Sequence, residues 1–166
     1  TAYQTLYYYG DDPAVYAQSI WIGLPSNFEV IEFYLSGPGS LYGPKVPAGF
    51  HFLTYIRTGT THRLYLDGAL IITHTLDISA WVVTHEFLGT DTFDTTAADP
   101  TKMGYFRGWN VAKTLAGTQD ERFSDIVVDV TNLWINTPLI DDLLDISGNG
   151  RDWGESGGTV TFTLPI

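Results

Sequence analysis

The chain contains no cysteine, which excludes disulfide bridges, thiolate metal sites and cysteine nucleophiles. Basic residues are scarce too: eight Lys and Arg stand against nineteen Asp and Glu, for a formal net charge of −11. A nucleic-acid-binding protein needs a basic footprint, so we expect no nucleic-acid partner. No apolar run approaches the roughly 18 residues of a transmembrane helix, and we expect no membrane insertion.

Aromatic residues make up 14% of the chain, and 17 Gly and 8 Pro are present. Thr, Val, Ile and Tyr are abundant whereas Lys and Glu are sparse, a mixture that favours strands over helices. The length of 166 residues, with no shift in composition, predicts a single domain over residues 1–166. Because the chain opens with Thr1 and not Met, we expect it to be a processed product or an excised piece, one module of a longer protein.

The segment 50–72 has the clearest secondary-structure pattern in the chain. Apolar residues alternate along it, and turn residues interrupt it at 58–61 and at Asp67-Gly68. This pattern predicts three strands in a meander. By contrast, residues 36–49 hold four Gly and three Pro and are expected to form a long loop.

Elsewhere, turn signals recur every 8–12 residues or so, which is typical of a β-sandwich or barrel. A single helical turn is expected within 113–121, and the type of segment 126–135 is left open. Further strands are expected at 1–9, 14–22, 28–35, 78–88, 103–111 and 159–164.

The 50–72 segment also resembles the central signature of laminin-G-like, or concanavalin A-like, jelly rolls. That signature is an aromatic-His-aliphatic strand ending near Arg, a Gly/Thr turn, and then L-Y-x-D-G. Here it corresponds to His51, Arg57 and Leu64-Tyr65-Leu66-Asp67-Gly68. The resemblance implies an all-β, two-sheet antiparallel jelly-roll sandwich. It also implies a binding module for glycans or proteins, since only some members are enzymes.

Two further segments support the resemblance. Residues 103–111, followed by Leu115 and Asp120-Glu121, are similar to the family's late strand and its L-S-x-x-E turn. Residues 145–150 read D-I-S-G-N-G, which resembles a family loop that lies near the N-terminus in many members. Since the loop is near the C-terminus here, either the strand order is permuted or the last segment leads into a following domain.

Catalysis is tested first against the glucanases, which place carboxylates at alternate positions of one strand. The chain has no E-x-D-x-E string. Glu29 and Glu32 are three apart and would point to opposite faces of a strand, and Asp91 and Asp94 are expected in a loop. The four His lie within strand patterns, and no G-x-S-x-G elbow accompanies them. We therefore expect no catalytic residues and no enzyme activity.

Calcium is the one cofactor that the sequence suggests. The D-x-S-x-N-G-x-D string places oxygen side chains at the first, third and fifth positions of a calcium loop. Its twelfth position is Ser156 and not the usual Glu. The alternative, which we favour, is a structural turn with Gly148 and Gly150 at positive φ. If the loop bound calcium, the ligands would be Asp145, Ser147, Asn149 and Asp152.

Glycan binding requires an exposed aromatic ring beside short polar side chains, because the apolar face of a sugar stacks on the ring. Trp21, Trp81 and Trp134 stand within apolar runs and are expected in the core. The candidates for ligand binding are instead Tyr42 in the Gly/Pro-rich segment, Trp109 with Asn110, and Trp153 beside Asp152.

The sequence therefore predicts a non-catalytic binding module of a surface or secreted protein, with carbohydrate as the first-choice ligand. Its location would be extracellular, on a cell surface or on a virion surface. The alternative is a structural decoration or fibre module of a virion or cell-surface assembly, held by contacts with neighbouring copies or other proteins. A lectin would gather exposed aromatics at one polar groove, whereas a structural module would bury them against neighbours.

Overall fold

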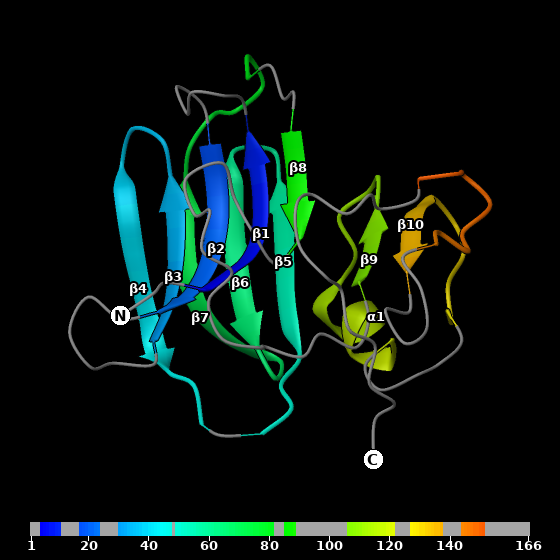
Figure 1. Cartoon of the computed structure of the whole chain (residues 1–166), viewed down its shortest axis with the longest axis horizontal. Coiled ribbons are helices and arrows are strands. Elements are labelled where there is room, and N and C mark those ends of the chain that lie inside the picture. The colour runs from blue at the N-terminus through cyan, green and yellow to red at the C-terminus, as the bar shows by residue number, and fades with distance from the viewer. Residues whose placement is uncertain are drawn as a thin grey trace. The chain divides into compact units, whose positions relative to one another are not determined.

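The structure is a computed structural model, and the chain is mostly β. It describes residues 4–10, 17–23, 30–47, 49–81, 85–88, 106–121, 127–137 and 144–151. Within those ranges it contains ten strands and one six-residue helix (Figure 1). The prediction of a β-rich chain, made from the composition, is thereby confirmed. The chain divides into two compact units, Thr1–Thr101 and Lys102–Ile166, whereas the composition indicated no boundary.

The first unit contains a five-stranded antiparallel sheet in the order β4-β3-β2-β1-β8. Four of its strands follow one another along the chain, and the last returns to pair with β1. Its strands are β1 (Gln4–Gly10), β2 (Ala17–Gly23), β3 (Val30–Leu35), β4 (Gly39–Lys45) and β8 (His85–Leu88).

The predicted meander is confirmed as the second sheet of this unit, in the order β5-β6-β7. Asp67 and Gly68 form the second turn with φ of 50° and 86°, the left-handed conformation that an Asp-Gly pair adopts readily. Phe50, however, lies before the first strand and is 68% exposed, so it is outside the core. The strands are β5 (Leu53–Thr58), β6 (Thr61–Leu66) and β7 (Ala69–Thr75).

The prediction of a long loop over residues 36–49 is wrong, because residues 39–45 form strand β4. Gly37 and Gly39 have positive φ and close a tight hairpin, so β4 returns directly along β3. The register shifts between Val30 and Glu32, opposite Gly43-Pro44, which marks an irregularity in the ladder. Pro44 is tolerated because β4 is an edge strand and need not donate on its outer side.

Side chains from both sheets of the first unit form one hydrophobic core. Ile20, Ile31, Phe33 and Leu35 come from the five-stranded sheet, and Leu64 and Ile72 come from the meander. Phe33 is fully buried, and its ring centroid lies 5.7 Å from that of Tyr55. Burial of this apolar surface is the main force that holds the two sheets.

The polar part of this core is centred on His62, which is fully buried. Its Nε2–H donates to the Leu76 carbonyl (2.9 Å), and its Nδ1 lies 2.7 Å from the Tyr55 hydroxyl. That hydroxyl also lies 3.0 Å from the side-chain amide of Gln18 in β2. The hydrogen bonds therefore connect the two sheets. Burial lowers the pKa of His62 below its ordinary value, so the neutral ring is favoured.

The motif residues His51 and Asp67, sixteen positions apart, form one contact in the structure. In its protonated form, His51 donates from Nδ1–H to Asp67 Oδ2 (2.7 Å) and from Nε2–H to the Pro47 carbonyl (2.9 Å). Asp67 Oδ1 accepts the backbone N–H of Phe52 (2.9 Å). The contact fastens the segment before β5 to the β6–β7 turn.

The second unit contains a two-stranded antiparallel sheet of β9 (Phe106–Trp109) and β10 (Leu133–Thr137), together with α1 (Leu115–Asp120). The expected helical turn is confirmed as α1, where Thr114 Oγ1 accepts the Gly117 N–H (3.1 Å) as an N-cap. Nowhere in the described ranges is there a helix with the length and apolarity to span a membrane.

Candidate functional site

Tyr42 is the most exposed of the predicted binding residues with a described aromatic ring, with 56% of its surface accessible. It lies in β4, at the edge of the five-stranded sheet, and not in a loop as the sequence suggested. The strand fixes its backbone, and the ladder pairs it with Glu32 of β3. Strand β4 thus presents the exposed ring from a fixed backbone position, with a polar residue across the ladder.

Glu32 is the buried polar centre beside this platform, with only 3% of its surface exposed. The hydroxyl of Ser40 donates to its Oε1. Its Oε2 is buried and has no hydrogen-bond partner. On the other side of β3, Glu32 pairs in register with Trp21 of β2. Tyr42, Ser40 and Glu32 thus combine an exposed ring, a hydroxyl and an unsatisfied acceptor.

Sequence reasoning considered Glu32 only as a catalytic carboxylate and missed its place beside Tyr42. The alternation of β3 was readable, because Ile31, Phe33 and Leu35 are buried on the core side and Glu32 lies between them. The pairing of Glu32 with Tyr42 could not be predicted, because the segment that contains Tyr42 and Ser40 was expected to be a loop. A hairpin reading of S-G-P-G at 36–39 would have paired these residues.

Trp109 and Asn110 lie in the second unit, at the end of β9. The Trp109 indole N–H donates to the Asp129 carbonyl (2.9 Å), and Lys113 Nζ lies 4.3 Å from the ring centroid. The half-buried ring therefore already has a cation on one face. Asn110 is exposed, and its backbone N–H donates to Asn132 (3.0 Å). This pair stays a prediction, with less open ring surface than Tyr42.

Glu121 is the buried carboxylate of the second unit and connects several of its segments. Its carboxylate accepts the backbone N–H groups of Val128 and Asp129 (2.8–3.1 Å) and lies 3.3 Å from Arg107 Nη1. Lys113 Nζ lies 3.9 Å from it and 2.8 Å from Asp129. Donation from Lys113 is the main reason that the pKa of Asp129 falls to about 2. The Glu of the L-S-x-x-E-like turn is thus a structural anchor here.

The D-I-S-G-N-G segment folds as a turn around Asp145. Asp145 Oδ1 accepts the N–H groups of Asn136 and Ser147 (both 2.9 Å), and Oδ2 accepts the Ser147 hydroxyl (2.8 Å) and the Arg151 N–H (3.1 Å). Burial acts to raise the pKa of Asp145, but these donors outweigh it and lower the pKa below its ordinary value. The contact from Ser147 N–H is that of an Asx-turn.

The same segment protects the free edge of β10. Asn149 Nδ2 donates to the carbonyls of Leu133 (3.0 Å) and Trp134 (3.1 Å), and the Ile146 N–H donates to Asn136 (2.8 Å). Unpaired edge groups invite pairing with other chains, and this loop satisfies them. Within the described residues, no group of three or more His, Asp or Glu is placed to hold a metal ion. Asp152, the fourth proposed ligand, and Trp153 lie outside those residues.

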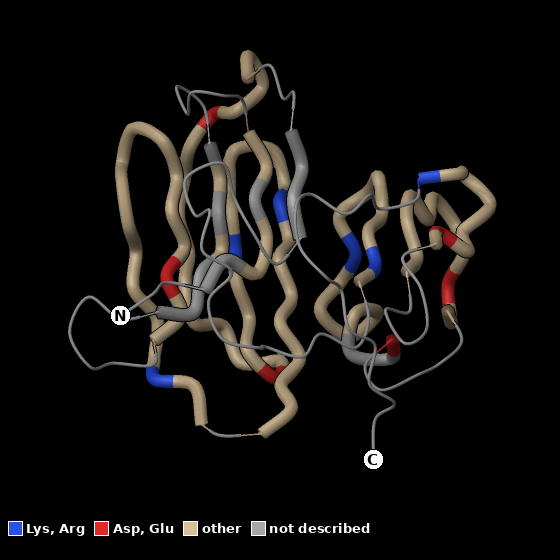
Figure 2. The backbone as a smooth tube through the Cα atoms, in the orientation of Figure 1, with Lys and Arg blue, Asp and Glu red and all other residues tan. Residues whose placement is uncertain are grey.

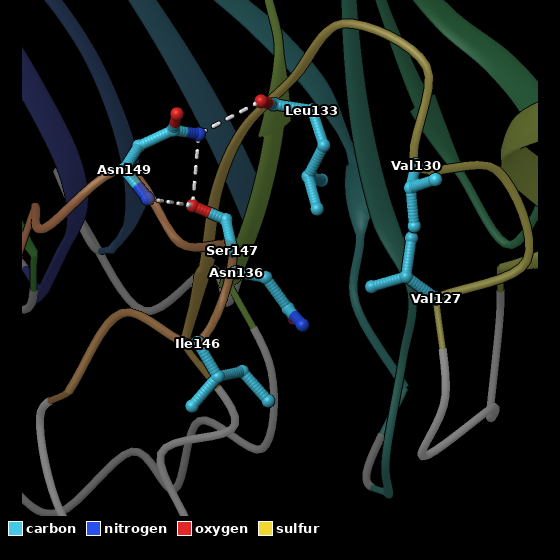
Figure 3. Close-up of a pocket in the computed structure, with 7 residues that line it drawn as sticks. All are labelled: Val127, Val130, Leu133, Asn136, Ile146, Ser147 and Asn149. Atoms are coloured by element: carbon cyan, nitrogen blue, oxygen red, sulfur yellow. Dashed lines mark hydrogen bonds between the residues drawn. The ribbon is translucent and has the colours of Figure 1, made fainter.

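A pocket of about 480 Å³ opens in the second unit (Figure 3). Figure 3 shows Val127 and Val130 on one side and Leu133, Asn136 and Ile146 on the other, with the Ser147–Asn149 hydrogen bonds at its rim. Its walls are mainly aliphatic. Five aliphatic side chains of this unit are 49–69% exposed, namely Val111, Val128, Val130, Leu144 and Ile146.

Basic positions are scattered within each unit and do not form a stripe in the described chain (Figure 2).

Comparisons with known proteins give no further guide to the site. No protein-family model matches this chain, and the comparisons with curated proteins and with solved structures give no match.

Proposed function

We propose that the protein is a non-catalytic carbohydrate-binding module of a secreted or surface-exposed protein, built as a two-sheet jelly-roll sandwich. The observation that carries the proposal is the exposed Tyr42 ring, held in a strand beside the buried carboxylate of Glu32. Sugars bind through apolar stacking on such rings and hydrogen bonds to fixed polar groups. The core shared by the two sheets supports the sandwich architecture of the proposal.

The test is glycan binding by the whole chain on an array, followed by calorimetry with any glycan retained. Replacing Tyr42 with Ala should lower affinity by about 1–3 kcal/mol, the scale of burying one large side chain. Phe50→Ala is the matched control, because Phe50 is also an exposed aromatic residue (68%) and lies before β5, outside the five-stranded sheet. Equal losses for both variants, or no retained glycan, would contradict the proposal.

A second candidate is a structural module held by contacts with neighbouring copies or other proteins. Val130 and Ile146 favour it, because both are exposed and line one pocket of the second unit, and exposed apolar surface often marks interaction sites. Sedimentation velocity distinguishes the two: this candidate requires concentration-dependent assembly that Val130→Asp reduces and Tyr42→Ala leaves unchanged.

A further inference from the structure

We infer that the pocket of the second unit binds a neutral acyl group, a carbonyl with a short alkyl chain, and that Asn136 recognises the carbonyl oxygen. That a sugar carries this acyl group rests on the proposed function, and the ligand class is then a glycan with N-acetyl substituents. The residues of this site belong to the second unit, whereas Tyr42 belongs to the first. It is therefore a second binding site.

The side-chain amide of Asn136 has one paired and one unpaired polar group. Asn136 is 4% exposed and lines the pocket. Arg107 Nε–H donates to its Oδ1 (3.1 Å), and because a guanidinium only donates, this contact assigns the amide oxygen to the side of Arg107. Within the described ranges, Nδ2 has no hydrogen-bond acceptor. Figure 3 shows the amide pointing toward the space between Ile146 and Val127.

The pocket is open to solvent, and hydrogen bonds hold both of its walls. Val130 and Ile146 are exposed on opposite sides of it (Figure 3). The Val130 carbonyl accepts the Leu133 N–H (3.2 Å), and the Ile146 N–H donates to the Asn136 carbonyl (2.8 Å). The pocket is thus formed before a ligand enters. Its volume of about 480 Å³ lies within the roughly 300–1,000 Å³ of small-ligand sites.

The lining of the pocket restricts the ligand. The free N–H groups of Asn136 require an acceptor, and the aliphatic walls favour an alkyl group. The Ser147 hydroxyl is already used, because it donates to Asp145 (2.8 Å) and accepts from Asn149 (3.0 Å). An acyl group supplies both parts: its carbonyl oxygen accepts from Asn136, and its alkyl chain contacts the walls.

A ligand carboxylate would also offer an acceptor, but the pocket has no countercharge for it. Arg107, which holds the oxygen of Asn136, has its Nη1 3.3 Å from the Glu121 carboxylate, and both side chains are buried. The charge of Arg107 is therefore already paired. Burying an anion without a cation of its own is strongly unfavourable. A neutral carbonyl accepts the same hydrogen bond without that penalty.

The experiment compares two oligosaccharides that differ only at C2 of each sugar, where chitotetraose has an acetamido group and cellotetraose a hydroxyl. In calorimetry with the whole chain, chitotetraose should bind about tenfold more tightly, the effect of one hydrogen bond to a buried donor. Asn136→Asp keeps the oxygen that Arg107 needs and removes the N–H donor. It should abolish this preference, whereas Tyr42→Ala should leave the preference in place.

Asn132→Asp is the matched control. It makes the same substitution at an exposed position of the same unit and should change neither affinity. Val130→Asp gives a second probe of the pocket, because it places a charge on an exposed part of the wall. It should also reduce the preference, and it reports on the site if Asn136→Asp does not fold by thermal melting.

Each outcome decides a separate point. Equal affinity for the two oligosaccharides overturns the acyl site and leaves the proposed function standing. No binding to any glycan overturns both. Concentration-dependent assembly of the parent protein that Asn136→Asp abolishes would assign the pocket to a neighbouring chain and would likewise overturn the acyl site.

Discussion

Asp145 accepts four hydrogen bonds and, with Asn149, fixes both the D-I-S-G-N-G turn and the edge of β10. At the scale of the residue, this explains why one short motif can read as a calcium loop and as a turn. Both uses need oxygen atoms at alternate positions and glycines at positive φ, which Gly148 (88°) and Gly150 (64°) supply. The two uses differ in what contacts the side-chain oxygens: N–H and hydroxyl donors in a turn, and a cation in a calcium loop.

Replacing Asp145 with Ala should lower the free energy of unfolding by about 1–3 kcal/mol, because three N–H donors, that of the buried Asn136 among them, lose their acceptor. Urea unfolding followed by Trp fluorescence measures the loss. Asp77→Ala is the control, because Asp77 accepts one N–H in an exposed turn, and its loss should be smaller. A melting temperature that calcium raises in the parent protein and not in the Asp145 variant would instead identify a metal site.

At the scale of the element, the β9–β10 pair depends on a close approach at Gly108. A Cβ added there would lie 3.0 Å from Trp134 Cε3 and 3.1 Å from Ile135 Cγ2, so the two strands pack with no space for a side chain. The register shift between Leu133 and Ile135 lies at the same place. Gly108 therefore has a packing role, and its φ is not the reason that glycine is needed.

Gly108→Ala should destabilise the second unit by about 1–3 kcal/mol, the usual penalty for overpacking. The reporters are urea unfolding and the near-ultraviolet dichroism of Trp109 and Trp134, which flank the contact. Gly117→Ala gives the comparison, because its Cβ would meet only Thr114 Oγ1 at 3.3 Å and Ala favours the helix. Equal stability of parent and Gly108→Ala would show that the strands separate freely at this point.

At the scale of the whole molecule, two histidines give the first unit opposite responses to pH. Hydrogen bonding to Asp67, with the Pro47 carbonyl, raises the pKa of His51, so its stabilising contribution is present below about pH 6.5 and is lost above it. Burial lowers the pKa of His62, with Arg57 and His74 adding to the effect. The contribution of His62 is present above about pH 6.5 and is lost as the pH falls.

The free energy of unfolding should therefore decline on both sides of neutrality between about pH 5 and pH 8. His62→Gln keeps a donor and an acceptor in the core but does not titrate, so it should flatten the acid side of the profile. His51→Gln should flatten the alkaline side by the same reasoning. The measurement compares the slope of the free energy of unfolding against pH, because the general destabilisation by each substitution shifts the curve without changing its slope. Unchanged slopes in both variants would refute the assignment of the two pH responses to these histidines.

Candidate platforms lie in different units: Tyr42 in the first, and Trp109 with Asn110 in the second. Among the described residues, five exposed aliphatic side chains lie in the second unit and Leu70 lies in the first, and the structural role is supported by those of the second unit. A glycan site on the first unit and a protein contact on the second are chemically compatible.

The sequence alone determined the β-rich character, the 50–72 meander and its Asp-Gly turn, and the short helix, because these depend on local alternation and turn chemistry. It did not determine β4, since Gly and Pro read as a loop until a neighbouring strand supplies the pairing. Only the tertiary structure joined His51 to Asp67, Glu121 to Arg107, and Glu32 to Tyr42. Register and burial depend on contacts distant in sequence, and no local pattern encodes them.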